Sequence, residues 1–257
     1  MLINNPTGIL ALSKREIMRF LSVATQTLFP PMISSILFLC IFGLALGKRI
    51  DLSEGGITYI AFIIPGLMTM NAITSSYENA SSSLFISRWH NHIQEVLLSP
   101  LSYFEMVLGI LVGSLVRSII VVNSVLVISL AVYPMPIAHP SLMIYFMITI
   151  PIIFSCMGMI AALWAEDFNM LTMWNTYFIM PLTFLGGVFH PLNLIPSQFR
   201  FITKLNPIYY LVTGMRYSII GVADTDIIYS IIVSMVLAIS MFSITVYLFR
   251  IGYKLRT

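Results

Sequence analysis

Three groups of residues have types and spacings that could support chemistry. His90, His92 and Glu95 carry metal-ligating groups, but two histidines two positions apart on a helix point away from each other. Residues 43–49 superficially resemble a phosphate loop. A true loop needs four residues between its glycines and a Ser or Thr after the lysine, whereas here three residues intervene and Arg49 follows Lys48. We therefore predict neither a metal site nor an ATP site in this chain.

The remaining histidines, acids and cysteines form no catalytic arrangement. His139 and His190 each stand alone beside a proline, and Asp224 and Asp226 lie in a semipolar segment. Nothing pairs a nucleophile with a base and an orienting acid. The two cysteines lie in separate apolar runs and make no redox motif. We predict that the chain is not an enzyme by itself.

Arg117 is the third candidate, because it interrupts a long apolar run. Gly109, Gly113 and Arg117 are spaced four residues apart, so they share a helix face that we expect to point into the protein. A buried charge in a membrane span marks a functional pathway by default, but it can also be a structural arginine bonded to carbonyls or polar side chains. We find no acid at matching depth, and we expect Asn71 and Asn123 as polar neighbours.

The composition indicates whether these residues belong to a soluble protein or to a membrane protein. Of 257 residues, 58% are hydrophobic and only 9% are charged, and the mean hydropathy is +0.95. Soluble domains carry about 25% charged residues. The net charge of +3 is also too small and too scattered for a nucleic-acid partner. These values exclude a soluble enzyme, a nucleic-acid-binding domain and a disordered chain, and they predict a helical protein that crosses a membrane several times.

Six apolar runs have the length of about 20 residues that a helix needs to cross a bilayer. They cover residues 28–46, 57–76, 103–132, 142–165, 170–189 and 227–249. Residues 190–226 are semipolar yet rich in aromatic residues. No repeat or linker divides residues 1–257, so we predict one all-α transmembrane domain.

Two further segments have helical spacing and an apolar face. Residues 7–27 predict a basic amphipathic helix on the membrane surface. Residues 85–98 predict a second one, which is either a connector or a docking element for a partner. Basic residues at both chain ends place both termini in the cytoplasm, because cytoplasmic segments are enriched in Lys and Arg. Residues 77–102 and the turn at Glu166 and Asp167 are then cytoplasmic, while residues 48–56 and 190–226 face outward.

The positions of the acidic residues indicate whether the chain could use an ion gradient to drive transport. All ten acids lie at the edges of apolar runs or in loops. Ion-coupled transporters place acids inside their spans, so the pattern disfavours a secondary transporter. Three possibilities stay open: a secondary transporter, a membrane scaffold without transport activity, and a transporter subunit powered by a separate ATPase.

Short motifs stand in order along nearly the whole chain. They include residues 26–31, 64–67 and 95–100. The most specific motifs come last in the chain. They contain Gly186, Gly187, Pro196, Asn206, Pro207, Arg216 and Gly221. This ordered set resembles the permease family of ABC-2 type transporters, most closely its YadH-type inner-membrane permeases.

The resemblance implies a fold and a function. The fold would have six transmembrane helices, an N-terminal interfacial helix and outer re-entrant helices within residues 190–226. The chain would be the permease subunit of an ATP-driven exporter in the bacterial inner membrane. It would move a lipid, glycan or drug-like substrate outward, past the first, second and fifth spans of two permease copies. ATP and Mg would bind a separate ABC ATP-binding subunit, and membrane lipids would surround the complex.

The resemblance also implies where the ATPase is contacted. Residues 85–98 would form the coupling helix, seated in a groove of the ATP-binding subunit. Its contacts would come from Phe85, Arg88, Trp89, Ile93, Glu95, Leu97 and Leu98. The turn at Glu166 and Asp167 would make a second, smaller contact. The substrate does not follow from the resemblance.

Overall fold

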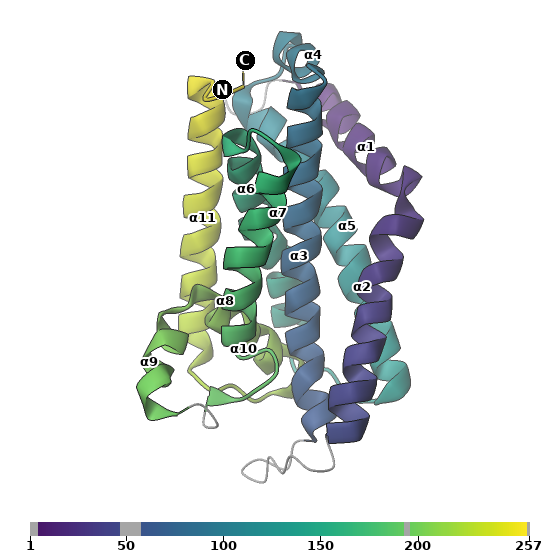
Figure 1. The fold of residues 1–257 in the computed structure, drawn as a ribbon, viewed down its shortest axis with the longest axis vertical. Coiled ribbons are helices and arrows are strands. Elements are labelled where there is room, and N and C mark those ends of the chain that lie inside the picture. The colour runs from purple at the N-terminus through teal and green to yellow at the C-terminus, as the bar shows by residue number, and fades with distance from the viewer. Residues whose placement is uncertain (1–4, 47–57, 193–195, 256–257) are drawn as a thin grey trace.

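The computed structural model describes residues 5–46, 58–192 and 196–255, and in these ranges the chain contains helices and no strand. The predicted all-α class is confirmed. Figure 1 shows an elongated bundle with the short helix α4 (Ile93–Leu98) at one end and α9 (Ser197–Leu205) near the other. The predicted outer loop of residues 48–56, with Lys48 and Arg49, lies outside the described residues.

Five helical stretches within the described residues are long and apolar enough to cross a membrane. Four contain the helices α3, α5, α6 and α11, and the first joins α2 to the start of the π-helix η1. Their bounds are α2 (Ala24–Phe38), η1 (Leu39–Leu46), α3 (Tyr59–Trp89), α5 (Tyr103–Val132), α6 (Pro140–Trp164) and α11 (Ile227–Ile251). The third predicted span, residues 103–132, coincides with α5. It begins at a capping box, in which Glu105 N–H donates to Ser102 Oγ and Ser102 N–H donates to Glu105 Oε2.

The fifth predicted span, residues 170–189, is a helical run in three consecutive pieces. These are α7 (Phe168–Trp174), the π-helix η2 (Asn175–Ile179) and α8 (Met180–Leu185). The run begins at Asp167, whose carboxylate accepts a hydrogen bond from Met170 N–H at 2.7 Å. It is not among the five long apolar stretches.

Helix α3 is longer than predicted, and the expected polar connection from residue 77 was wrong. The helix continues past the predicted end at residue 76 to Trp89, with Asn79, Ser81 and Ser83 all buried along the way. Ser82 Oγ donates to Glu78 O at 2.6 Å, one turn back on the same helix. Small hydroxyl side chains that are satisfied in this way pack closely against neighbouring helices, although hydropathy scores them as polar.

The predicted single helix over residues 85–98 was also wrong. Phe85 and Trp89 belong to the last turns of α3, and α4 begins at Ile93. Between them Asn91 has a φ of 59°, in the left-handed region that ends a right-handed helix. The segment is therefore two helices at an angle, not one continuous amphipathic face.

The predicted N-terminal helix of residues 7–27 corresponds to α1 (Pro6–Ser22). This helix ends before Val23, and α2 begins directly after that residue. Helix α1 packs along α5, and its buried face contains Leu12, Glu16 and Phe20. The outer segment contains α9 and α10 (Pro207–Ile220), and α10 is buried against α3, α6 and α11. Helix α3 packs against α5, α6 and α10, and α1 lies along α5.

Candidate functional site

The end of the bundle that carries α4 brings the two predicted ATPase contacts together. The Phe85 ring stacks on Trp89 at 5.8 Å between centroids and meets Phe168 edge-on at 6.0 Å. A pocket of about 470 Å³ opens beside them, and Arg88 and Glu166 also line it. The end of α3 and the turn before α7 thus lie side by side, although the sequence had indicated only two separate contacts.

The predicted coupling residues divide into outward and inward groups. Trp89 is 64% exposed and Leu98 is 87% exposed, and Glu95 is also exposed with a carboxylate oxygen 3.6 Å from His92 Nδ1. Ile93 is buried and Leu97 is half-buried, so both fix α4 to the bundle. The outward group therefore leaves two large apolar side chains, Trp89 and Leu98, exposed at this end of the bundle.

Arg88 and Asp167 stabilise the ends of the helices that form the surface at this end of the bundle. Arg88 Nη1 donates to the carbonyls of Ala162 and Ala165, where α6 ends. A cation at a helix C-terminus is stabilised by the carbonyl groups left without partners there. Asp167 caps α7. Both residues therefore position the surface through contacts inside the chain.

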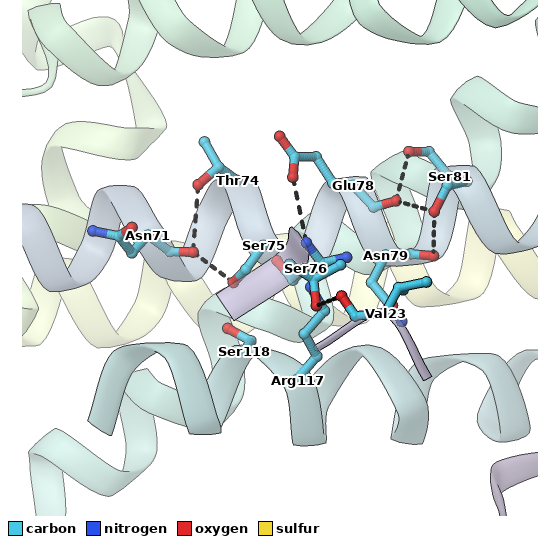
Figure 2. Close-up of polar contacts among 12 residues, drawn as sticks. Val23, Asn71, Thr74, Ser75, Ser76, Glu78, Asn79, Ser81, Arg117 and Ser118 are labelled. Atoms are coloured by element: carbon cyan, nitrogen blue, oxygen red, sulfur yellow. Dashed lines mark hydrogen bonds and ion pairs between the residues drawn. The ribbon is translucent and has the colours of Figure 1, made fainter. Parts of the chain in front are cut away.

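Figure 2 shows Arg117 reaching from α5 toward Glu78 on α3, and Arg117 Nη2 lies 3.5 Å from Glu78 Oε2. The expectation that no acid matches the depth of Arg117 was wrong, because Glu78 belongs to the unforeseen extension of α3. The expected amide neighbours have other partners. Asn71 Nδ2 donates to Ser35 Oγ, and Asn123 Nδ2 donates to Ile119 O.

A polar pocket of about 360 Å³ opens at this ion pair. Gln26 and Thr27 of α2 line it from one side, and Asn175 of η2 lines it from another. The Arg117 side chain is only 7% exposed, and its Nε has no hydrogen-bond partner. The Oδ1 atom of Asn175 is likewise buried and without a partner. The pocket thus combines two opposite charges with unused hydrogen-bonding capacity.

A larger, apolar pocket of about 570 Å³ lies between α6, α7 and α11. Tyr77 lines both pockets, and its hydroxyl donates to Leu171 O at 3.1 Å. Trp164 and Trp174 line the apolar pocket. Tyr77 and α7 therefore separate a polar space from an apolar one.

Glu16 is a functional-site candidate that the sequence reasoning missed. It is completely buried and bonded to Arg15 at 3.1 Å and to Arg19 at 3.2 Å. Ser83 of α3 donates to the same carboxylate, and Arg19 in turn donates to Asn79 Oδ1. A signal was present, because Glu16 follows Leu12 by four residues and precedes Phe20 by four. An acid therefore stood on the apolar face of the predicted helix.

The glycine face of α5 points inward as predicted, and its partner is α1. A Cβ atom at Gly109 would lie 2.5 Å from Leu12 Cδ2. At Gly113 it would lie 2.5 Å from Glu16 Cβ. Only glycine permits this approach, so the two glycines hold α1 against α5, whereas the network around Glu16 ties α1 to α3.

The residues of the C-terminal motif form a network at the other end of the bundle. Arg216 is 1% exposed, donates to Gly187 O at 2.6 Å, and lies 3.4 Å from Asp224 Oδ2. Its guanidinium carbon also stands 3.7 Å above the Phe62 ring, a cation–π contact. His190 lies near this network, and its burial, together with Arg216, lowers the pKa of its imidazole below the ordinary value.

The other members of the motif end or begin helices. Asn206 Oδ1 accepts from Ile208 N–H and its Nδ2 donates to Leu182 O at 2.6 Å, which ties α10 to α8. Pro207 is the first residue of α10, and Gly221 ends it with a φ of 74°. The rest of the motif flanks α8 and α9, with Gly186 and Gly187 after the first and Pro196 before the second. Sequence patterns alone did not assign these roles.

Together these features describe a helical protein with several helices long and apolar enough to cross a membrane, and with Trp89 and Leu98 exposed at one end. The family model of the ABC-2 type transporter matches residues 7–220. The chain is also 32% identical to the inner membrane transport permease YadH of Escherichia coli (strain K12), over 95% of this chain and 94% of that protein. It therefore belongs to the ABC-2 type transporter family, whose members are transmembrane subunits of ABC transporters.

More distant relatives carry another name. Nodulation protein J of Neorhizobium galegae is 23% identical over 86% of each chain. Nodulation protein J of Rhizobium meliloti (strain 1021) is 20% identical over 82% of this chain and 81% of that protein. The similarity to an inner membrane permease and the apolar helices support a multi-pass protein of the inner membrane.

Proposed function

We propose that the chain is the permease subunit of an ATP-driven exporter, working as two copies with a separate ABC ATP-binding subunit. The observation that carries the proposal is the family match over residues 7–220. The exposed apolar surface of Trp89 and Leu98 supports it, because it offers a docking site at one end of the bundle. ATP and Mg would bind the partner subunit, and the cargo would be a lipid, a glycan or a drug-like compound that moves outward.

The exporter fold needs a sixth span, which we assign to the run from Phe168 to Leu185. At 1.5 Å per residue this run is about 27 Å long, close to the 30 Å of a hydrocarbon core. Six spans place both termini on one side. Asn5 N–H donates to Glu105 at the start of α5, and Lys254 Nζ lies 3.2 Å from Glu166, so both ends lie with α4. We assign this side to the cytoplasm, which leaves α9 and α10 as the outer re-entrant helices.

The contacts suggest how ATP binding would reach the membrane. A partner that moves α4 and Trp89 displaces the end of α3, a single helix from Tyr59 to Trp89. The contact between Phe85 and Phe168 passes that displacement to α7. Helices α2, α3 and α7 surround the polar pocket at Arg117, so their relative movement opens or closes a path between two copies.

ATP hydrolysis by the purified complex in nanodiscs tests the coupling surface. Trp89→Ala combined with Leu98→Asp removes the exposed apolar contact and leaves the buried side of α4 unchanged. We expect the rate to fall at least tenfold. Val222→Asp, at an exposed apolar position just after α10 and outside the spans, is the control for adding an acid to an exposed apolar position. Equal rates for the double variant and the wild type would contradict the docking role, as a scaffold without an ATPase partner predicts.

A further inference from the structure

The residues that follow α11 turn back on the helix and form a C-terminal hook, residues 252–255. Helix α11 ends at Ile251, and Gly252 follows it with a φ of 70°. Tyr253 N–H donates to Leu248 O at 3.1 Å, the bond that closes a helix ended by a left-handed glycine. Figure 1 shows that this end of α11 lies at the same end of the bundle as α4.

The hook is fixed to the bundle at its own end. Leu255 is 3% exposed and packs in the hydrophobic core, and its N–H donates to Gly252 O at 3.3 Å. Lys254 has a φ of 49°, a left-handed conformation that residues other than glycine keep only where their surroundings hold it. The buried Leu255 therefore determines where the Lys254 side chain begins.

Lys254 binds the connection between α6 and α7. Its Nζ atom lies 3.2 Å from Glu166 Oε1 and donates to Trp164 O at 3.5 Å. Arg88 of α3 donates to two other carbonyls at the same end of α6. The C-terminal end of a helix favours positive charge, so the two cations stabilise it together. The turn at Glu166 and Asp167 is thus held by α3 on one side and by the hook on the other.

The hook also completes the pocket of about 470 Å³ at this end of the bundle. The end of α3, the turn after α6 and Lys254 line it together. The Lys254 side chain is 36% exposed, whereas the Glu166 side chain is 79% exposed. Lys254 therefore restrains the Glu166 carboxylate and leaves most of it accessible to a partner.

We propose that the C-terminal hook positions the turn at Glu166 and Asp167 for the ATP-binding subunit, with Lys254 acting through Glu166 as a positioning residue. The inference rests on the proposed function, because it takes this turn to be a contact of that subunit. The family match ends at residue 220 and does not supply this role. Without Lys254 the partner has to order Glu166 when it binds, which weakens binding. Hydrolysis in the assembled complex is unchanged, because ATP binds the partner.

Hydrogen–deuterium exchange of the purified full chain in detergent tests the positioning without a partner. Lys254→Met removes the charge and keeps most of the side-chain length. We expect peptides that contain Glu166 and Asp167 to exchange about threefold faster in this variant, because local opening is no longer opposed by the ion pair. Lys254→Arg should exchange like the wild type, as should the matched control Arg250→Met, at an exposed position in the last turn of α11. Unchanged exchange in Lys254→Met would overturn the proposal.

Titration of the chain in nanodiscs with the purified ATP-binding subunit separates binding from turnover. Lys254→Met should raise the subunit concentration that gives half-maximal ATP hydrolysis by about threefold to fivefold, the range expected for one exposed ion pair. The maximal rate should stay unchanged. In the Glu166→Gln variant, adding Lys254→Met should change little, because Lys254 acts through Glu166. Equal effects with and without Glu166 would show that Lys254 contacts the partner directly, and would overturn the positioning role.

The two proposals fail in different ways. A wild-type chain that binds no ATP-binding subunit would overturn the proposed function and the role of the hook with it. A Lys254→Met chain that binds the subunit as tightly as the wild type would overturn the role of the hook alone.

Discussion

Gly113 of α5 and Glu16 of α1 touch so closely that a Cβ atom at Gly113 would lie 2.5 Å from Glu16 Cβ. The acid is therefore buried by backbone contact and bonded to Arg15, Arg19 and Ser83. This contact makes α1 a structural part of the bundle as well as the interfacial helix that we propose. The hydrogen bond from Ser83 to Glu16 also joins α1 to α3, and we propose that the end of α3 at Trp89 belongs to the docking surface.

Replacing Gly113 by valine should separate α1 from α5. Three added carbon atoms cannot fit where the Cβ alone would collide, so we expect the midpoint of thermal unfolding in detergent to fall by at least 5 °C. The control is Val127→Leu, at a position on α5 that is 66% exposed, which should shift the midpoint little. A Gly113→Val protein as stable as the wild type would show that α1 does not pack where the structure places it.

Removing the Glu16 charge should destabilise the chain through the groups that it leaves unpaired. In Glu16→Ala, Arg19 and the Ser83 hydroxyl lose their buried acceptor, and we expect a loss of about 2 kcal/mol in the free energy of unfolding. Glu95→Ala removes an exposed acid of α4 and should have little effect on stability. Urea unfolding in mixed micelles measures both, and equal stability of the two variants would contradict a structural role for Glu16.

The pair of Glu78 and Arg117 should respond unequally to the loss of either partner. Glu78→Gln leaves the buried Arg117 without a counter-charge, whereas Arg117→Met leaves a Glu78 that water already reaches. We expect Glu78→Gln to lower the free energy of unfolding by about 1 kcal/mol. The double variant should regain most of that loss. If adding Arg117→Met lowered the free energy of unfolding of the Glu78→Gln variant further, groups other than Glu78 would have to stabilise the buried Arg117 charge.

Arg216 should be the least replaceable of the motif residues. Arg216→Lys keeps the charge but cannot reach Gly187 O, Asp224 and the Phe62 ring together, because lysine lacks the planar fork of donors. We expect a loss of about 3 kcal/mol, seen as poor recovery from the membrane and a lowered unfolding midpoint. Arg250→Lys, an exposed arginine at the end of α11, is the matched control. Equal recovery of both proteins would mean that the network does not hold α10 in place.

Prediction from the sequence succeeded where apolar content and helix boundaries agree. Residues 103–132 match α5 because a long apolar run begins directly at the capping box of Ser102 and Glu105. It failed at α3, where serines buried by neighbouring helices were taken for solvent-exposed ones. That single error also concealed Glu78 as the partner of Arg117, because an acid in a loop has no defined depth.

The candidate sites, too, could be predicted from the sequence only in part. Motif resemblance singled out Asn206 and Arg216, but their bonds to Leu182 and Gly187 depend on how α8 and α10 pack. The polar pocket could not be predicted, because α2, α3, α5 and η2 contribute to it from distant parts of the chain. The burial of Glu16 was foreseeable from its position between Leu12 and Phe20 on one helix face.

The most direct measurement is purification of the tagged full chain from the membranes of its own host in a mild detergent, with quantitative identification of the proteins that accompany it. We predict one ATP-binding subunit, recognisable by its phosphate loop, in a 1:1 ratio with the permease, and its loss when Trp89→Ala and Leu98→Asp are combined. Recovery of the wild-type chain, folded and without any ATP-binding protein, would contradict the account.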